Sequence, residues 1–164
     1  MRRIAIAPRG TADALGDLAR IVATSPGGGD VVNQGFARRH VFGALEHVAD
    51  AGLRLCMALF ETAPRPIPLD VTIMERHARS AQAILSMRGG WIVLVAPDAG
   101  NRPAMEGARA VSLGPGEGVI YAPGTWHHPI IAPGAPGLFL VQSWKDDTPA
   151  DMDEVAVEGW RLDW

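Results

Sequence analysis

Two titratable residues, Glu75 and His77, stand two positions apart in a segment with a strand-like pattern. Apolar residues recur at positions 69, 71 and 73, and alternate residues of a strand share one face. Continued along the segment, this alternation places Glu75 and His77 on the apolar, inward side. It places Met74 and Arg76 on the outward side.

A carboxylate and an imidazole on a buried face destabilise the fold unless they are paired or solvated. An unpaired buried polar group costs about 1–3 kcal/mol, and a buried charge costs more. Either the two side chains build a polar cavity, or the strand ends at Met74 and both lie in a loop. For each residue alone, a salt bridge or a satisfied histidine is as good an interpretation as function. For the pair we favour function, because titratable groups that share a cavity suit general acid–base catalysis.

A second pair of candidates, His127 and His128, follows a Pro-Gly turn at residues 123–124. Adjacent strand residues face opposite ways, so at most one of the two histidines is expected in the cavity. Pro129 pushes His128 toward extended geometry. The alternative is a loop with two solvated imidazoles, which the neighbouring Trp126 disfavours.

A third polar group, Asn33-Gln34-Gly35, is followed by Arg38, Arg39 and His40. Taken alone, this group is best interpreted as a polar turn with a solvated basic face. Motifs for nucleophilic catalysis and for phosphate binding are absent from the sequence. Cys56 lies in an apolar run, and Gly27–Gly29 lacks the lysine and hydroxyl of a phosphate-binding loop.

The elements that must position these residues are short strands between turns. The 164 residues suit a single domain over residues 1–164, and 19 glycines and 13 prolines are spread along it. Strands are expected at 4–7, 30–41, 53–60, 69–77, 81–87, 91–96, 108–113, 118–121, 128–131 and 138–143. A helical turn is expected from Thr11 to Gly16, and 41–50 reads as a short helix or a hairpin arm. This density predicts an all-β jelly-roll barrel with one or two short helices.

Charge and composition exclude several partners. With 15 basic and 18 acidic residues the net charge is −3, which argues against nucleic acid. The apolar runs are far shorter than the ~18–20 residues of a membrane span. The single cysteine allows no internal disulfide, and Arg9 interrupts any signal sequence, so we expect a cytoplasmic protein.

The spacing of these residues resembles the cupin motifs. In the first motif, Glu75 and His77 stand at the His-x-His positions, Gln82 follows after four residues and Gly89 after six more. In the second, Pro123 and His128 have the expected separation, although the glycine comes one place early. The chain therefore resembles a cupin in which Glu and Gln replace a His and a Glu.

A more specific resemblance is to the ureidoglycolate lyase family. It rests on Leu15-Gly-Asp-Leu18, Asn33-Gln-Gly35 with Arg39, Glu75-Arg-His77 with Gln82, and Trp126-His-His-Pro129. These elements occur in order over roughly residues 8–145. The chain departs from the family pattern at Ala78, where members usually carry proline, and at Ser143-Trp144, where they often carry Asp-Arg.

The resemblance implies cleavage of (S)-ureidoglycolate to glyoxylate and urea, a step of allantoin and purine catabolism. It implies His77 or His128 as base and Glu75 as acid or orienting group. The remaining residues implied to contact substrate are Gln82 and Asn33 for the ureido group, Arg39 for the carboxylate, and His127.

The sequence leaves the metal question open. Glu75, His77 and His128 would form a two-histidine, one-carboxylate set for a divalent first-row metal, although a neutral Gln82 weakens such a site. Two other functions remain: a metal-dependent cupin enzyme acting on another small carboxylic acid, and a cupin that binds a small ligand without catalysis. Pairing of edge strands, common in cupins, predicts a homodimer.

Overall fold

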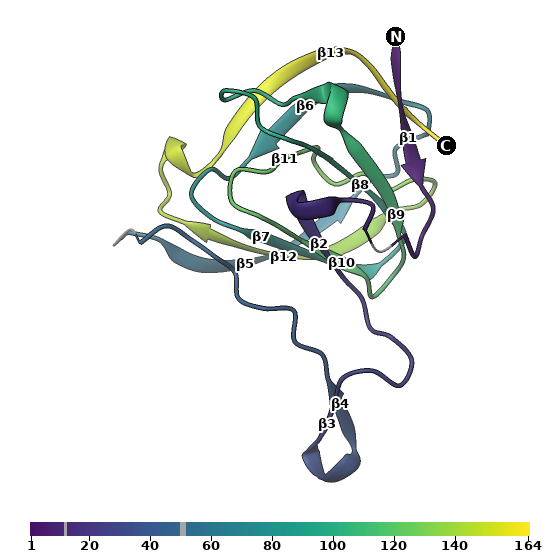
Figure 1. The fold of residues 1–164 in the computed structure, drawn as a ribbon, viewed down its shortest axis with the longest axis vertical. Coiled ribbons are helices and arrows are strands. Elements are labelled where there is room, and N and C mark those ends of the chain that lie inside the picture. Colours follow the sequence, from purple (N-terminus) through teal and green to yellow (C-terminus); the bar gives the residue numbers. More distant parts are fainter. Residues whose placement is uncertain (12, 50–51) are drawn as a thin grey trace.

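The computed structural model describes residues 1–11, 13–49 and 52–164. Its centre is a closed barrel in which β1 pairs in parallel with both β13 and β9 (Figure 1). In order around the barrel, the strands are β1 (Arg2–Ala7), β13 (Asp153–Asp163), β6 (Leu69–Arg76), β11 (Trp126–His127), β8 (Trp91–Ala96) and β9 (Arg109–Leu113).

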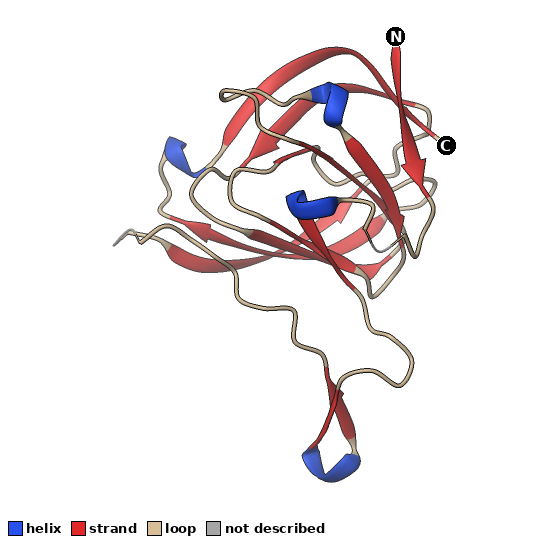
Figure 2. Cartoon of the chain, in the orientation of Figure 1, coloured by secondary structure: helices blue, strands red, loops and turns tan. Residues whose placement is uncertain are grey.

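A five-stranded antiparallel sheet, which we call sheet B, packs against one wall of this barrel (Figure 2). Its strands, in order, are β2 (Ala19–Val22), β10 (Gly118–Tyr121), β7 (Gln82–Arg88), β12 (Gly137–Lys145) and β5 (Arg54–Thr62). Sheet B and the barrel wall together form the two layers of a jelly roll. The all-β jelly-roll prediction is therefore confirmed.

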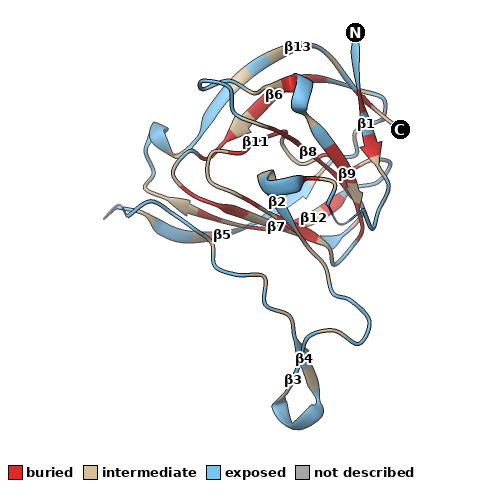
Figure 3. Ribbon diagram, viewed as in Figure 1, coloured by how far each residue is buried: buried red, intermediate tan, exposed pale blue. Residues whose placement is uncertain are grey.

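Strand β8 shows why the sequence Trp-Ile-Val-Leu-Val-Ala forms a strand that is buried on both faces (Figure 3). Trp91, Val93 and Val95 join the core between the barrel wall and sheet B. Ile92 and Leu94 join the core inside the barrel. A strand between two apolar layers needs no polar face, so its sequence is a continuous apolar run.

A two-stranded hairpin, which we call the arm, projects from the body on the side of sheet B (Figure 1). It consists of β3 (Asp30–Val32), a single 3-10 turn η2 (Asn33–Gly35) and β4 (Ala37–Arg39). The expectation of one strand over 30–41 was wrong, because Asn33, Gln34 and Gly35 all have positive φ and reverse the chain.

The helical content is limited to short 3-10 turns in the described residues, the others being η1 (Gly16–Leu18), η3 (Met105–Gly107) and η4 (Pro149–Asp151). Gly16 begins the first turn instead of ending one, and residue 12 of the expected turn lies outside the described residues. Residues 41–49 form neither a helix nor a hairpin arm, and residue 50 is outside the described part. No helix in the described ranges has the length and apolar character to cross a bilayer.

One strand prediction needs correction, and two strands were not predicted. The strand expected at 128–131 ends earlier, at His127, and only an isolated bridge remains at Ile131. Strands β2 and β13 were not expected. Gly159 interrupts the apolar pattern of β13, where the register with β6 shifts between Ala156 and Trp160.

Candidate active site

Glu75 and His127 face each other across the β6–β11 pair. The two residues are register partners, and Glu75 Oε1 lies 3.4 Å from His127 Nε2. This separation suits an ion pair, but His127 Nε2 is not aligned for a hydrogen bond. The Glu75 carboxylate therefore lies beside His127 Nε2, and this nitrogen can still form a hydrogen bond with a ligand.

The alternation that we used to orient Glu75 does not run regularly along β6. Val71 and Met74, three residues apart, both belong to the core inside the barrel. The phase of the strand thus changes between them, opposite the irregular register of β13. The prediction that Met74 points outward is wrong, because Met74 is fully buried and packs in the core inside the barrel.

Arg76 is also buried rather than outward in solvent. Its guanidinium donates to Asp153 (2.8 Å), Asp98 (2.9 Å) and Asn101 (2.8 Å). It also lies over the Trp126 ring, 4.7 Å from the centroid. Arg76 therefore belongs to a structural network on the face of β6 opposite Glu75.

Both adjacent histidines are buried in the interior, so the alternative of a loop with two solvated imidazoles is wrong. His127 and His128 are 1% and 3% exposed. Strand β11 ends at His127, so the side-chain alternation of a strand does not extend to His128. The charge of Glu75 acts on the pKa of His128, which shows that the two groups share one electrostatic environment.

Hydrogen bonds fix the ring of His77 in one tautomer. Its Nδ1 lies 2.9 Å from the Asp151 carbonyl oxygen, so this nitrogen carries the proton. The Gln82 amide then donates to His77 Nε2 over 2.8 Å. The Oε1 atom of Gln82 is left buried without a partner, available to accept a hydrogen bond from a ligand.

The two other histidines differ in what their Nε2 atoms meet. His128 Nδ1 donates to the Pro129 carbonyl over 2.7 Å, and its buried Nε2 has no partner. A neutral His128 therefore presents a free lone pair. His127 Nδ1 lies 3.0 Å from the Thr125 carbonyl oxygen and its Nε2 faces Glu75, so both ring nitrogens lie beside oxygen acceptors. The ring also stacks on Tyr121, with centroids 4.1 Å apart.

Burial and neighbouring charges set the protonation states. Burial raises the pKa of Glu75, but the contact with His127 and the charges of His127, His77 and His128 outweigh it, so this pKa lies below its ordinary value. Burial lowers the pKa of both His77 and His128, more than their backbone hydrogen bonds raise it. Near neutral pH the cluster therefore holds an ionised carboxylate and two neutral imidazoles.

A cavity of about 220 Å³ opens beside this cluster between β5, β6, β7 and β12. Glu75 and Gln82 supply its polar lining together with Thr62, and the remaining lining residues are Phe60, Ile84, Pro129, Ile130 and Val141. An apolar cavity with a few converging polar groups is the usual form of a small-molecule site. Its dimensions suit a small organic acid.

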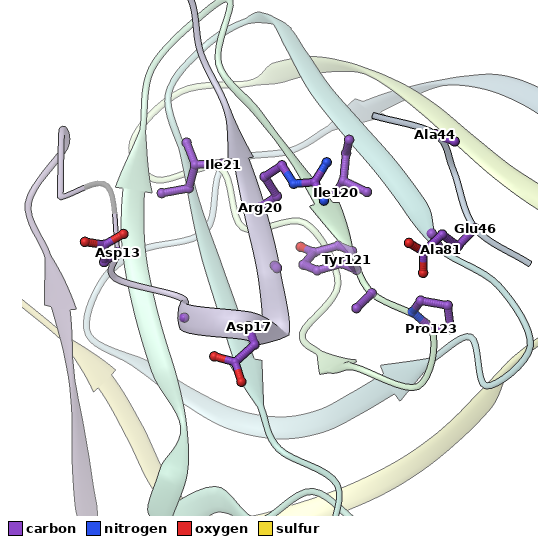
Figure 4. A pocket seen from close by; sticks show the side chains of 13 residues that line it. Asp13, Asp17, Arg20, Ile21, Ala44, Glu46, Ala81, Ile120, Tyr121 and Pro123 are labelled. Atoms are coloured by element: carbon purple, nitrogen blue, oxygen red, sulfur yellow. The ribbon is translucent and has the colours of Figure 1, made fainter. Parts of the chain in front are cut away.

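A larger hollow of about 460 Å³ lies elsewhere, behind Tyr121 (Figure 4). Asp13, Asp17, Arg20 and Glu46 line it, while Tyr121 forms a wall whose ring stacks on His127. Neither Glu75 nor Gln82 lines this hollow. We assign the candidate active site to the smaller cavity, because it is lined by Glu75, which faces His127, and by Gln82, which contacts His77.

Asn33 and Arg39 are not brought to this cavity. Both are exposed on the arm, and Arg39 pairs with Asp30 at 3.2 Å. The cations that act on the cluster are others: the charge of Arg65 lowers the pKa of His128, and that of Lys145 lowers the pKa of His77. Sequence reasoning missed both, because Arg65 lies in a proline-rich connector and Lys145 at the end of a strand.

The same cluster does not have the arrangement of a metal site. No group of three or more His, Cys, Asp or Glu side chains in the described ranges is arranged to hold a metal ion. Glu75 faces His127, while the Nε2 of His77 is occupied by Gln82. As arranged, these side chains do not fit a two-histidine, one-carboxylate centre, and we derive no step through a metal.

Comparison with known proteins decides the family. A profile of the ureidoglycolate lyase family matches residues 1–163. The chain belongs to the ureidoglycolate lyase family. Among its relatives, a ureidoglycolate lyase of Rhizobium etli (strain ATCC 51251 / DSM 11541 / JCM 21823 / NBRC 15573 / CFN 42) is 34% identical over 90% of this chain and 88% of the relative. Ureidoglycolate lyase 1 of Rhizobium meliloti (strain 1021) is 34% identical over 80% of this chain and 76% of the relative.

Among solved structures, the Lactobacillus farciminis oxalate decarboxylase in complex with formate is similar over 63% of this chain. The sequence identity is 18% and the TM-score 0.43, and the match spans 26% of that longer chain. The family resemblance noted from the sequence is thus confirmed by the family profile and the relatives.

Proposed function

We propose that this ureidoglycolate lyase family member cleaves (S)-ureidoglycolate to glyoxylate and urea in the cavity lined by Glu75 and Gln82. The observation that carries the assignment of the site is the buried, unpartnered Nε2 of His128 close to the Glu75–His127 pair. A buried nitrogen without a partner costs about 1–3 kcal/mol, and a substrate hydroxyl would supply the missing hydrogen bond.

The reaction needs one proton removed and one delivered. The substrate carbon carries a hydroxyl, a carboxylate and a ureido nitrogen. His128 Nε2 takes the hydroxyl proton, the C–O bond becomes a carbonyl, and the C–N bond breaks toward nitrogen. The doubly protonated ring of His127 gives its Nε2 proton to the departing nitrogen, which leaves as urea. Atoms and charge balance without water.

Glu75 is the orienting group in this scheme. Its lowered pKa makes it an ionised carboxylate at neutral pH, so of the two roles implied for it, acid and orienter, the second fits better. Its charge stabilises the imidazolium of His127 as long as the proton has not been transferred. His77 holds Gln82 in place, and Gln82 Oε1 accepts from the ureido N–H groups.

The substrate carboxylate requires a cation. We assign this role to Arg65, whose charge reaches His128 and whose backbone N–H is held by the Ala132 carbonyl at 2.9 Å. The sequence had suggested Arg39, which lies on the arm. Within one chain, we therefore assign binding of the substrate carboxylate to Arg65 and not to Arg39.

The deciding experiment measures urea and glyoxylate released from (S)-ureidoglycolate by the purified protein. We expect equal amounts of both products, and loss of turnover in Glu75→Gln and His127→Gln. No release by the wild-type protein would overturn the assigned reaction and favour another small acid or mere binding. The assay is repeated after chelation, and activity lost with the chelator and restored by a divalent metal would overturn the metal-free scheme.

The same proposal assigns the protein to allantoin and purine degradation in the cytoplasm, acting as a homodimer. The purine link follows from the substrate, and the lone cysteine fits a reducing compartment.

A further inference from the structure

An ion-pair network joins the turn after β6 to the segment after β12. Arg79, in the turn between β6 and β7, donates from Nη2 to two carboxylates, that of Asp146 at 2.6 Å and that of Asp151 at 3.0 Å. These aspartates begin and end the segment Asp146–Asp151, which we call the clasp and which connects β12 to β13 (Figure 1). The proposed reaction uses none of these three side chains.

Hydrogen bonds within the clasp add to those from Arg79. The Asp151 carboxylate is 7% exposed and also accepts from the backbone N–H groups of Asp146 and Asp147, each over 3.1 Å. The Asp146 carboxylate accepts from the Thr148 hydroxyl at 2.7 Å and from its N–H at 3.0 Å. The contacts with Thr148 and Arg79 hold the pKa of Asp146 well below its ordinary value. The clasp is thus fixed by charge-assisted hydrogen bonds, with Arg79 bridging its two ends.

The backbone of Asp151 connects the clasp to the active site. Its carbonyl oxygen lies 2.9 Å from His77 Nδ1. A carbonyl oxygen can only accept, so Nδ1 carries the proton and the Nε2 atom of the neutral ring keeps a lone pair. Gln82 must therefore turn its amide N–H toward His77 Nε2, over 2.8 Å. The Gln82 Oε1 atom is what remains for the cavity, and it is buried without a partner among the described residues.

We propose that Arg79, acting through the clasp, is a positioning residue of the active site: it fixes the tautomer of His77, so that Gln82 offers an acceptor to the ligand. This acceptor favours the N–H donors of a ureido or carboxamide group over a carboxylate or ester oxygen, whose lone pairs would repel those of Oε1. The identity of the ligand rests on the proposed function, whereas the control of the His77 tautomer does not.

The consequence of losing Arg79 follows from the charges that it bridges. The carboxylates of Asp146 and Asp151 both lie against one nitrogen, so without the cation they repel each other. The clasp then opens, and the Asp151 carbonyl no longer holds the proton on His77 Nδ1. When the proton moves to Nε2, Gln82 must turn its oxygen toward the ring and its amide N–H groups toward the cavity. The ureido N–H groups then meet donors instead of an acceptor.

The first test detects the tautomer directly. Histidine labelled with ¹⁵N in the ring shows which nitrogen carries the proton, and the signals of His77 are assigned by their loss in His77→Gln. Because the pKa of His77 is lowered, the ring is neutral at pH 7. We expect the proton on Nδ1 in the wild type and a shift toward Nε2 in Arg79→Met. Arg79→Lys keeps a cation between the carboxylates and should restore the wild-type signals.

The matched control is Arg54→Met. Arg54 pairs with Asp147 of the same clasp, but both side chains are largely exposed. Its loss should leave the His77 signals and the kinetics unchanged. Should Arg79→Met fail to fold, Asp151→Asn weakens the same ion pair with a smaller change in volume and should shift the tautomer in the same direction.

The second test uses initial rates with (S)-ureidoglycolate. Gln82 contacts the ureido group alike in the bound substrate and in the transition state, so its loss as an acceptor should affect KM more than kcat. We expect Arg79→Met to raise KM roughly tenfold, and Arg79→Lys to recover most of it. A general loss of structure would instead lower kcat and the melting temperature together.

The two readouts fail in different ways. A proton on Nε2 of His77 in the wild type, or unchanged His77 signals in the folded Arg79 and Asp151 variants, would overturn the positioning role. A changed tautomer with an unchanged KM would refute the selection of N–H donors. If the wild type does not cleave ureidoglycolate, the assigned reaction fails, and the ring signals alone still decide whether Arg79 controls the tautomer.

Discussion

Replacing His128 by glutamine tests the base directly. The Nδ1 atom of His128 donates to the Pro129 carbonyl, and its Nε2 is buried without a partner. A glutamine fills a similar volume and keeps an N–H donor, but it cannot accept a proton. We therefore expect a folded enzyme that lacks the base.

The expected loss in kcat is about 10²–10⁴-fold, the usual contribution of a general base. At about 1.36 kcal/mol per tenfold, this corresponds to about 3–5 kcal/mol of transition-state stabilisation. The melting temperature should change by only a few degrees, since the nitrogen that is removed makes no hydrogen bond in the protein.

The pH profile separates a base from a structural residue. Burial holds the pKa of His128 below the ordinary 6.5, so the fall of the wild-type kcat/KM on the acid side should begin below pH 6.5. In His128→Gln this acid limb should flatten. The matched control is His47→Gln, an exposed histidine outside the cavity, which should keep wild-type activity.

The assay follows glyoxylate release under saturating and limiting (S)-ureidoglycolate. Turnover of His128→Gln within about tenfold of the wild type, with an unchanged acid limb, would refute the assignment of His128 as base.

Three further outcomes are expected. Arg65→Gln should raise KM about tenfold or more with little change in kcat, and Arg65→Lys should restore part of it, as measured by initial rates. The free energy of unfolding in urea should fall as the pH drops from 7 to 5. His77 and His128 have folded pKa values below 6.5, so the unfolded chain binds more protons in this range. Below pH 4.5, protonation of Glu75 should lower the free energy of unfolding further, because its folded pKa is also lowered. An unchanged urea midpoint over this range would contradict the pKa directions. Arg76→Met should cost about 2 kcal/mol of stability, because two partly exposed aspartates lose their cation, while kcat stays near wild type. A variant as stable as the wild type would show that solvent screens these ion pairs.

The sequence predicted the strands of the jelly roll better than the way they are paired. Turn residues separated the segments at 69–77, 81–87, 91–96 and 118–121, and each became a strand within one or two residues. Strand β13 was missed because its bulge at Gly159 breaks the alternation that identifies a strand. The barrel closure by β1 and β13 depends on contacts between distant segments, which no local pattern shows.

The candidate site was predicted in composition more than in geometry. Glu75, His77, Gln82, His127 and His128 do gather, although the alternation used to orient the first two is irregular. Strict alternation failed because Val71 and Met74, three residues apart, both pack in the core inside the barrel. Arg65 could not have been found, because an irregular connector has no periodicity from which to infer a direction.

The parallel pairing of residues 2–5 with residues 160–163 has a consequence for synthesis. During translation β1 is synthesised at the start, whereas its partner β13 is synthesised only near the end. Until the second arrives, the barrel interior around Met74 and Leu94 remains open on one side. Contacts of such long range are slow to form and expose apolar surface meanwhile. A nascent chain that stalls before residue 153 would therefore present its inner wall to chaperones and to its neighbours.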